Sequence, residues 1–345
     1  MTTDNRLSSY RTTYLLPWII YLTPSFKKLI TFVICAVLIS HTYATQEFIQ
    51  LPINNIKAQH KGYVRVGIFQ PKNRSAHGDI LFLHGHADRL DNHPTLFNTW
   101  TQAGFRVISF DWPSHGLSRT MPIDTFTFDE LAAIAILVEK QTAAEKERPL
   151  ILAGWSFGGL VATRISQQVN LHRIFSRPLT ALLLITPGIA VHPFSGGDGV
   201  ARLSTLTNNP NPPVAGPPSP ALPIQNPLFA IRLLAAAWQA QQQALPQKLP
   251  TFIALAGDQT DWYVNTPKLK HWIKRFPKQH TQVDIWQCPE AKHALDHEPY
   301  PVGPYIRNQI IAFLSEQIDK QLVLPTLISP PCVRLNNKIK GDNNS

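Results

Sequence analysis

The sequence predicts an α/β domain built on a mostly parallel central sheet with helices on both faces. Two observations lead to this prediction. Short, continuously apolar runs, typical of strands buried on both faces, recur at residues 79–83, 105–110, 150–155, 182–185 and 251–256. Helix-length segments with apolar residues at turn spacing lie between many of these runs. Such alternation of buried strands and helices is typical of a parallel sheet with right-handed crossovers.

The remaining elements follow from local patterns. Residues 47–53 and 62–70 alternate apolar and polar side chains, which indicates two half-exposed strands of an antiparallel ribbon. A last strand is expected at residues 282–286. Helices are expected at residues 94–103, 128–141, 160–168, 267–276 and 304–314.

Residues 1–44 have the pattern of a signal peptide or membrane anchor. A pair of lysines precedes an apolar run at residues 29–39, and small residues occupy the −3 and −1 positions of a cleavage site before Thr45. The run is too short to span a bilayer comfortably, so a secreted or periplasmic protein is expected. A second apolar patch at residues 14–22 is unusual ahead of an export signal, and it keeps anchoring through an uncleaved leader open as the alternative.

The strand pattern divides the rest of the chain. A first core segment, residues 45–188, is followed by residues 189–250, which contain no buried strand and are rich in proline. The core resumes at residues 251–318, and residues 319–345 form a C-terminal tail. A long insertion between two core strands is interpreted as a lid over the carboxyl edge of the sheet. It carries one expected helix, residues 228–243, with Ile231, Leu234 and Trp238 on its packing stripe; a disordered linker is the alternative.

The chain is basic, with a formal net charge of +10, of which +7 remains without residues 1–44. A charge of this size can favour anionic membranes or nucleic acid. No nucleic-acid motif accompanies it, so no nucleic-acid partner is expected. The densest basic cluster is instead interpreted as the solvated face of a helix; it consists of Lys268, Lys270, Lys274, Arg275 and Lys278.

Two cysteines, Cys288 and Cys332, follow the leader. An even pair in an oxidising compartment suggests a disulfide that ties the tail to the domain. Two free thiols are the alternative.

The run that ends in Gly154-Trp155-Ser156-Phe157-Gly158 passes directly from a strand into a helix. Glycines two residues before and after the serine allow a tight turn that holds the hydroxyl outward. The helix that follows directs free N–H groups and the positive end of its dipole at the serine. Acidic and histidine candidates follow later strands, so they are expected at the same rim of the sheet. A serine hydroxyl needs a histidine to accept its proton and an acid to orient that histidine.

On these motifs, residues 62–317 resemble the α/β-hydrolase fold, in the branch of monoacylglycerol lipases, lysophospholipases and serine aminopeptidases. The resemblance rests on matched segments in the family's order: His84-Gly85; Asp111 with His115-Gly116-Leu117-Ser118; the serine motif; Gly257 with Asp261-Trp262-Tyr263-Val264; and His293 with Glu298.

The resemblance implies that Ser156 is the nucleophile and His293 the general base. It implies Asp261 as the acid, because an apolar pair ending in Val follows it, while Asp258 stays open as a rival closer to the strand end. His297 competes with His293.

The resemblance also implies an oxyanion hole formed by the backbone N–H groups of His86 and Phe157. The side chain of His86 departs from the small or apolar residue usual there, which puts a preference for long acyl chains in doubt. Asp111 and His115 are expected to stabilise loops.

The predicted function is a serine hydrolase that cleaves acyl esters, such as monoacylglycerols or lysophospholipids, through an acyl-enzyme, with peripheral membrane contact possible. A serine aminopeptidase and a non-catalytic ligand-binding protein are the alternatives. No cofactor is expected. No metal site is expected either, because no histidine pairs with Cys, Asp or Glu at helical ligand spacing.

Overall fold

The computed structural model describes residues 45–56, 61–72, 75–145, 147–168, 174–192, 227–276, 283–318 and 330–335. The predicted leader at residues 1–44 lies outside these ranges, as do the proline-dense part of the insertion and most of the tail. The lid and the alternative of a linker therefore stay predictions.

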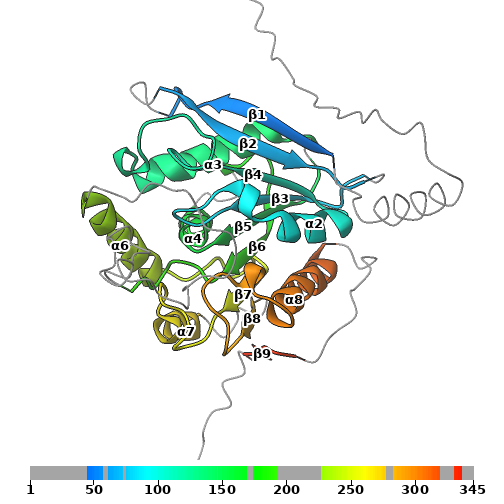
Figure 1. Ribbon diagram of the computed structural model, residues 1–345, viewed down its shortest axis with the longest axis vertical. Coiled ribbons are helices and arrows are strands. Elements are labelled where there is room, and N and C mark those ends of the chain that lie inside the picture. Colours follow the sequence, from blue (N-terminus) through cyan, green and yellow to red (C-terminus); the bar gives the residue numbers. More distant parts are fainter. Residues whose placement is uncertain are drawn as a thin grey trace, which may run out of the picture. The chain divides into compact units, whose positions relative to one another are not determined.

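The described residues form one nine-stranded sheet of order β1-β2-β4-β3-β5-β6-β7-β8-β9 (Figure 1). Six neighbouring strands from β4 to β8 in this order are parallel, whereas β1, β2 and β9 pair antiparallel to their neighbours. The predicted mostly parallel sheet is confirmed. The strands are β1 Gln46–Pro52, β2 Tyr63–Phe69, β3 Asp79–Leu83, β4 Arg106–Phe110, β5 Leu150–Trp155, β6 Leu179–Ile185, β7 Thr251–Leu255, β8 Val283–Gln287 and β9 Val333–Arg334.

Helices cover both faces of the sheet, as predicted. The α-helices are α2 Pro94–Gln102, α3 Phe128–Thr142, α4 Phe157–Ser166, α6 Pro227–Gln242, α7 Thr266–Lys274 and α8 Val302–Gln317. Strand alternation separates two cores: Leu81 and Leu83 of β3 pack with α3, α4, α6 and α7, whereas Ile80 and Phe82 pack with α2 and α8. Figure 1 shows α2 and α8 together on one side of the sheet. The six predicted helices all form, with bounds that differ by a few residues.

The packing face predicted for α6 is wrong. Ile231 and Trp238 are each 61% exposed, while Phe229, Leu233 and Ala240 are buried. The buried residues recur at helical spacing and include several alanines, which let α6 lie close to α4. Leu234, the third residue of the predicted stripe, is half-buried.

A buried charge network lies at the amino ends of the strands. Asp79, the first residue of β3, accepts hydrogen bonds from Arg106 at 2.9 Å and from Arg177 at 2.6 Å. Arg177 also pairs with Glu139 of α3 at 3.2 Å. This network occupies the edge of the sheet opposite the carboxyl rim.

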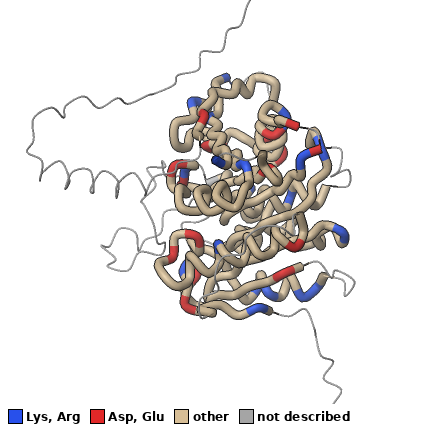
Figure 2. Tube along the Cα trace, turned by 90° about the vertical axis from the view of Figure 1, so that its right-hand side faces the viewer, with Lys and Arg blue, Asp and Glu red and all other residues tan. Residues whose placement is uncertain are grey.

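The basic cluster of α7 is solvated, as predicted, at Lys268, Lys274 and Arg275, which are exposed. Lys270 departs from the prediction, since it is half-buried and pairs with Asp258 at 2.7 Å. Figure 2 shows positive and negative residues interspersed along the described chain. None of the described helices is both long and apolar enough to cross a bilayer.

The predicted link between the tail and the domain is confirmed, since Cys288 and Cys332 form a disulfide. The sequence predicts no strand in the tail, yet β9 directly follows Cys332 and pairs with β8. Two residues are too few to show a strand pattern, so the disulfide rather than the β9 sequence fixes this pairing.

Replacing Cys332 with Ser is expected to lower the free energy of unfolding by about 2–4 kcal/mol, because the bond closes a loop of 44 residues. Urea denaturation of the oxidised protein measures the difference. Reductant should destabilise the wild type by a similar amount and leave the variant unchanged. An unfolding midpoint of the wild type that does not respond to reductant would contradict the expectation.

Candidate active site

Ser156 lies in a strained turn between β5 and α4. Its backbone φ of 54° is in the left-handed region, which is costly for a residue with a side chain. A Cβ added to Gly154 would lie 2.4 Å from the carbonyl oxygen of Gly158. A Cβ added to Gly158 would lie 1.9 Å from the carbonyl oxygen of Leu83. Only glycine fits at both positions, so the turn can press the start of α4 against the end of β3.

The structure brings together the three predicted side chains Ser156, His293 and Asp261. His293 Nε2 lies 2.7 Å from Ser156 Oγ, and His293 Nδ1 lies 3.0 Å from Asp261 Oδ2. Both His293 and Asp261 are 3% exposed. In the tautomer that this network favours, the serine hydroxyl donates to Nε2 and Nδ1–H donates to the carboxylate.

Backbone contacts fix the acid and the histidine. Asp261 Oδ1 accepts hydrogen bonds from the backbone N–H groups of Tyr263 and Val264, each at 2.9 Å. The carbonyl oxygen of His293 accepts from Thr186 Oγ1 at 2.7 Å and from Trp155 Nε1 at 3.1 Å. These two donors follow or end neighbouring parallel strands, so the rim of the sheet itself holds the histidine loop. Neither donor is among the site residues predicted from the sequence.

The rival residues lie elsewhere. Asp258 accepts hydrogen bonds from Lys270 at 2.7 Å and from Gln287 at 2.8 Å, and its side chain is 39% exposed. His297 faces Asp296 at 3.5 Å. The geometry therefore pairs His293 with Asp261 and leaves both rivals out of this chain of hydrogen bonds.

The loop after β3 carries the second predicted N–H group. The rings of His86 and Phe157 lie 6.2 Å apart, and the close approach of Gly158 to the Leu83 and His84 carbonyls holds the loop against the start of α4. Among the described residues, neither the His86 nor the Phe157 backbone N–H has a hydrogen-bond acceptor. Both are thus free to donate to a charge that develops beside Ser156.

Asp111 and His115 hold the surrounding loops, as predicted. Asp111 accepts backbone hydrogen bonds from Leu90 at 2.9 Å and Leu117 at 2.8 Å. His115 Nε2 accepts from the Ala87 N–H at 3.1 Å, directly beside His86. Burial lowers the pKa of His115, so it is neutral and can accept this bond.

A cavity opens beside Ser156. Leu233 brings α6 of the insertion to this cavity, whose lining is mostly apolar: Ser156, Phe157, Leu160, Gly188, Val191, Leu233, Tyr263 and Val264. Among the described residues, this lining suits an apolar group.

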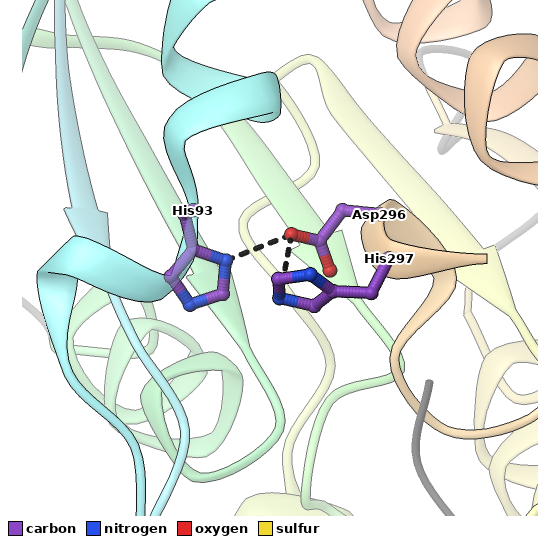
Figure 3. A group of neighbouring side chains, drawn as sticks. All are labelled: His93, Asp296 and His297. Carbon is purple, nitrogen blue, oxygen red and sulfur yellow. Dashed lines mark hydrogen bonds and ion pairs between the residues drawn. The ribbon is translucent and has the colours of Figure 1, made fainter. Parts of the chain in front are cut away.

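One set of side chains in the described chain has the composition of a metal site, although the sequence predicts none. His93, Asp296 and His297 place one potential ligand atom each within 4.8 Å of one another (Figure 3). The set lies behind Trp155, whose ring centroid is 5.6 Å from that of His93. It is therefore separate from the chain of hydrogen bonds at Ser156. Because 203 residues separate His93 from Asp296, no sequence spacing could reveal it.

The model of the family described as "Alpha/beta hydrolase family" matches residues 80–306. The chain belongs to the alpha/beta hydrolase family. The matched residues of this alpha/beta hydrolase run from β3 to α8 and include Ser156, Asp261 and His293.

Solved structures share the fold of this alpha/beta hydrolase at low sequence identity. A carboxyl esterase from Bacillus coagulans in complex with glycerol has a TM-score of 0.58 at 16% identity, covering 79% of this chain and 99% of its own. A monoglyceride lipase variant from Saccharomyces cerevisiae with a substrate analog has a TM-score of 0.56 at 16% identity, covering 78% and 97%. A Paleococcus ferrophilus monoacylglycerol lipase has a TM-score of 0.56 at 17% identity, covering 74% and 99%. No curated protein matches the sequence.

Proposed function

We propose that the protein is a serine hydrolase that cleaves acyl esters through an acyl-enzyme. The observation that carries the proposal is the continuous chain of hydrogen bonds from Ser156 through His293 to Asp261, beside an apolar cavity. Each residue has the partner that its role requires. The nucleophile Ser156 has a proton acceptor in His293, and His293 has the buried carboxylate of Asp261.

In the proposed reaction, Ser156 Oγ attacks the ester carbonyl carbon while its proton passes to His293 Nε2. Asp261 stabilises the imidazolium that forms. The N–H groups of His86 and Phe157 donate to the carbonyl oxygen as it becomes negative, an effect of about 3 kcal/mol per donor. Collapse of the tetrahedral intermediate breaks the ester C–O bond, and the His293 proton passes to the leaving alcohol. Water, deprotonated by His293, then hydrolyses the acyl-Ser156 ester and releases the acid.

The proposed substrates are monoacylglycerol-like or lysophospholipid-like esters. The apolar lining of the cavity supports an acyl substrate. Esterases and monoacylglycerol lipases of the same fold are consistent with this chemistry. An aminopeptidase would need an acidic group to bind the substrate amine, and the described cavity lining contains no carboxylate. Contact of the basic protein with an anionic membrane surface remains part of the proposal.

We further propose that the protein is secreted or periplasmic, with membrane anchoring as the alternative. The leader pattern supports export, and the Cys288–Cys332 disulfide is typical of an oxidising compartment. Amino-terminal sequencing of the protein from its native cells is expected to find Thr45 as the first residue. An intact leader in the membrane fraction would favour anchoring, and an intact leader in the cytosol would contradict export.

Fluorophosphonate reagents are expected to label the wild-type protein and not Ser156→Ala, because only an activated serine attacks them. Loss of the nucleophile should lower turnover of acyl esters on the order of a million-fold. Mass spectrometry of the labelled peptide locates the adduct, and a panel of short and long acyl esters and aminoacyl amides defines the substrate class.

The panel separates the alternatives. Faster cleavage of aminoacyl amides than of esters would replace the esterase by a peptidase. A folded wild-type protein that takes no label and cleaves no member of the panel would favour a ligand-binding protein.

Asp261→Asn is expected to lower kcat about 10⁴-fold, because an amide in place of the carboxylate favours the wrong tautomer of His293. Asp258→Asn is the matched control. It removes a half-exposed carboxylate that contacts Lys270 and Gln287 rather than His293, so kcat should stay within about twofold. Steady-state kinetics on one ester measures both. The reverse result would assign the acid to Asp258.

A further inference from the structure

A buried cluster of three charged side chains joins the two loops that flank the proposed active site. The cluster consists of Asp88, His93 and Asp296. His93 Nε2 lies 2.6 Å from Asp88 Oδ2, and His93 Nδ1 lies 2.7 Å from Asp296 Oδ2. The His93 side chain is fully buried, and the side chains of Asp88 and Asp296 are 6% and 1% exposed. Figure 3 shows the His93 ring at the start of α2 pointing across at Asp296.

Charge holds this cluster together. Burial by itself would lower the pKa of His93, but Asp88 and Asp296 outweigh burial and raise the pKa to about 10. Conversely, burial would raise the pKa of Asp88 and Asp296, and His93 holds both below the usual value. At neutral pH an imidazolium thus donates one hydrogen bond to each of two carboxylates, in the geometry of strong charge-assisted bonds.

The distance between His93 and Asp296 fits a shared proton better than a bridging metal ion. Nitrogen and oxygen ligands of a tetrahedral zinc ion, each about 2.1 Å from the metal, lie about 3.4 Å from one another. The separation of 2.7 Å between His93 Nδ1 and Asp296 Oδ2 is instead that of a hydrogen bond. One feature still matches a metal site: buried Asp296 Oδ1 has no hydrogen-bond partner in the described chain. Zinc is therefore the competing occupant that an experiment must test.

The cluster is linked to each part of the proposed machinery. Asp88 lies two residues after His86, the proposed oxyanion donor, and Asp296 lies three residues after His293. The Trp155 ring packs near both histidines, with its centroid 5.6 Å from that of His93 and 5.5 Å from that of His293. Trp155 also donates a hydrogen bond to the His293 carbonyl and directly precedes Ser156. A shift of His93 would therefore displace the loop of His86, the loop of His293 and the Trp155 side chain that precedes Ser156.

We propose that His93 is a positioning residue which, as an ionic brace between Asp88 and Asp296, sets the distance between the loop of His86 and the loop of His293. The proposal rests on the proposed hydrolase function for its effect on rate. The brace acts through Trp155 and the two loops and makes no contact with the substrate. Removing one member of a buried ion group leaves the other charges uncompensated, so both loops should shift or loosen.

The test compares His93→Gln and Asp296→Asn with Glu139→Gln. The control variant also breaks a buried ion pair, with Arg177, but at the opposite edge of the sheet. Each His93-cluster variant is expected to lower kcat and the rate of fluorophosphonate labelling about 10- to 100-fold and to change KM less than about threefold, because small displacements of reacting groups cost rate rather than binding. Glu139→Gln should lower the urea midpoint and leave kcat within about twofold.

Amide hydrogen exchange of residues 84–88 and 291–298 provides a readout independent of activity. Exchange in both segments should accelerate in the cluster variants and not in Glu139→Gln. If His93→Gln does not fold, the milder Asp296→Asn decides. If the wild-type protein takes no label, the hydrolase proposal fails while the exchange data still decide on the brace.

Two results would overturn the brace. One is a folded cluster variant with wild-type exchange in both segments. The other is the binding of one zinc ion per chain that raises the labelling rate. If His297→Gln loses this zinc and the exposed control His271→Gln keeps it, the cluster is a metal site.

Discussion

The active-site arrangement depends on the close contact between the first turn of α4 and the end of β3. Gly158 lies so near the Leu83 carbonyl that a Cβ would overlap it. This contact forces the left-handed conformation of Ser156 and brings the N–H of Phe157 beside the loop of His86. The strain is local, but it is supported by the surrounding sheet: the Ser156 N–H donates to the Ile185 carbonyl on β6, and the Ser156 carbonyl accepts from Gly188.

Most of the fold could be predicted because its information is local. Strands buried on both faces are short apolar runs, and the glycines around Ser156 mark a turn that no other residue permits. The roles of Ser156 and His293 were implied by the family resemblance of their motifs, and each residue follows a strand whose carboxyl end lies at one rim. The structure places their side chains within hydrogen-bond distance.

The choices that the sequence left open depend on three-dimensional packing. Asp258 and Asp261 follow the same strand, and only the path of the loop decides which one reaches His293. The face of α6 was mispredicted because helical spacing gives this helix more than one apolar stripe, and the stripe with Phe229, Leu233 and the alanines is the buried one. The cluster at His93 joins residues that lie 203 positions apart in the sequence. In the sequence, its members have no pattern that distinguishes them from ordinary loop residues.

The short strand β9 has a consequence for solubility. β8 would otherwise be the last strand of the sheet, with N–H and C=O groups available to a strand from another molecule. β9 covers Trp286 and Gln287 at the carboxyl end of β8, and the disulfide keeps it there. Reduction would uncover this margin of the sheet next to the hydrophobic ring of Trp286, so the redox state of one bond would govern whether neighbouring molecules self-associate edge to edge.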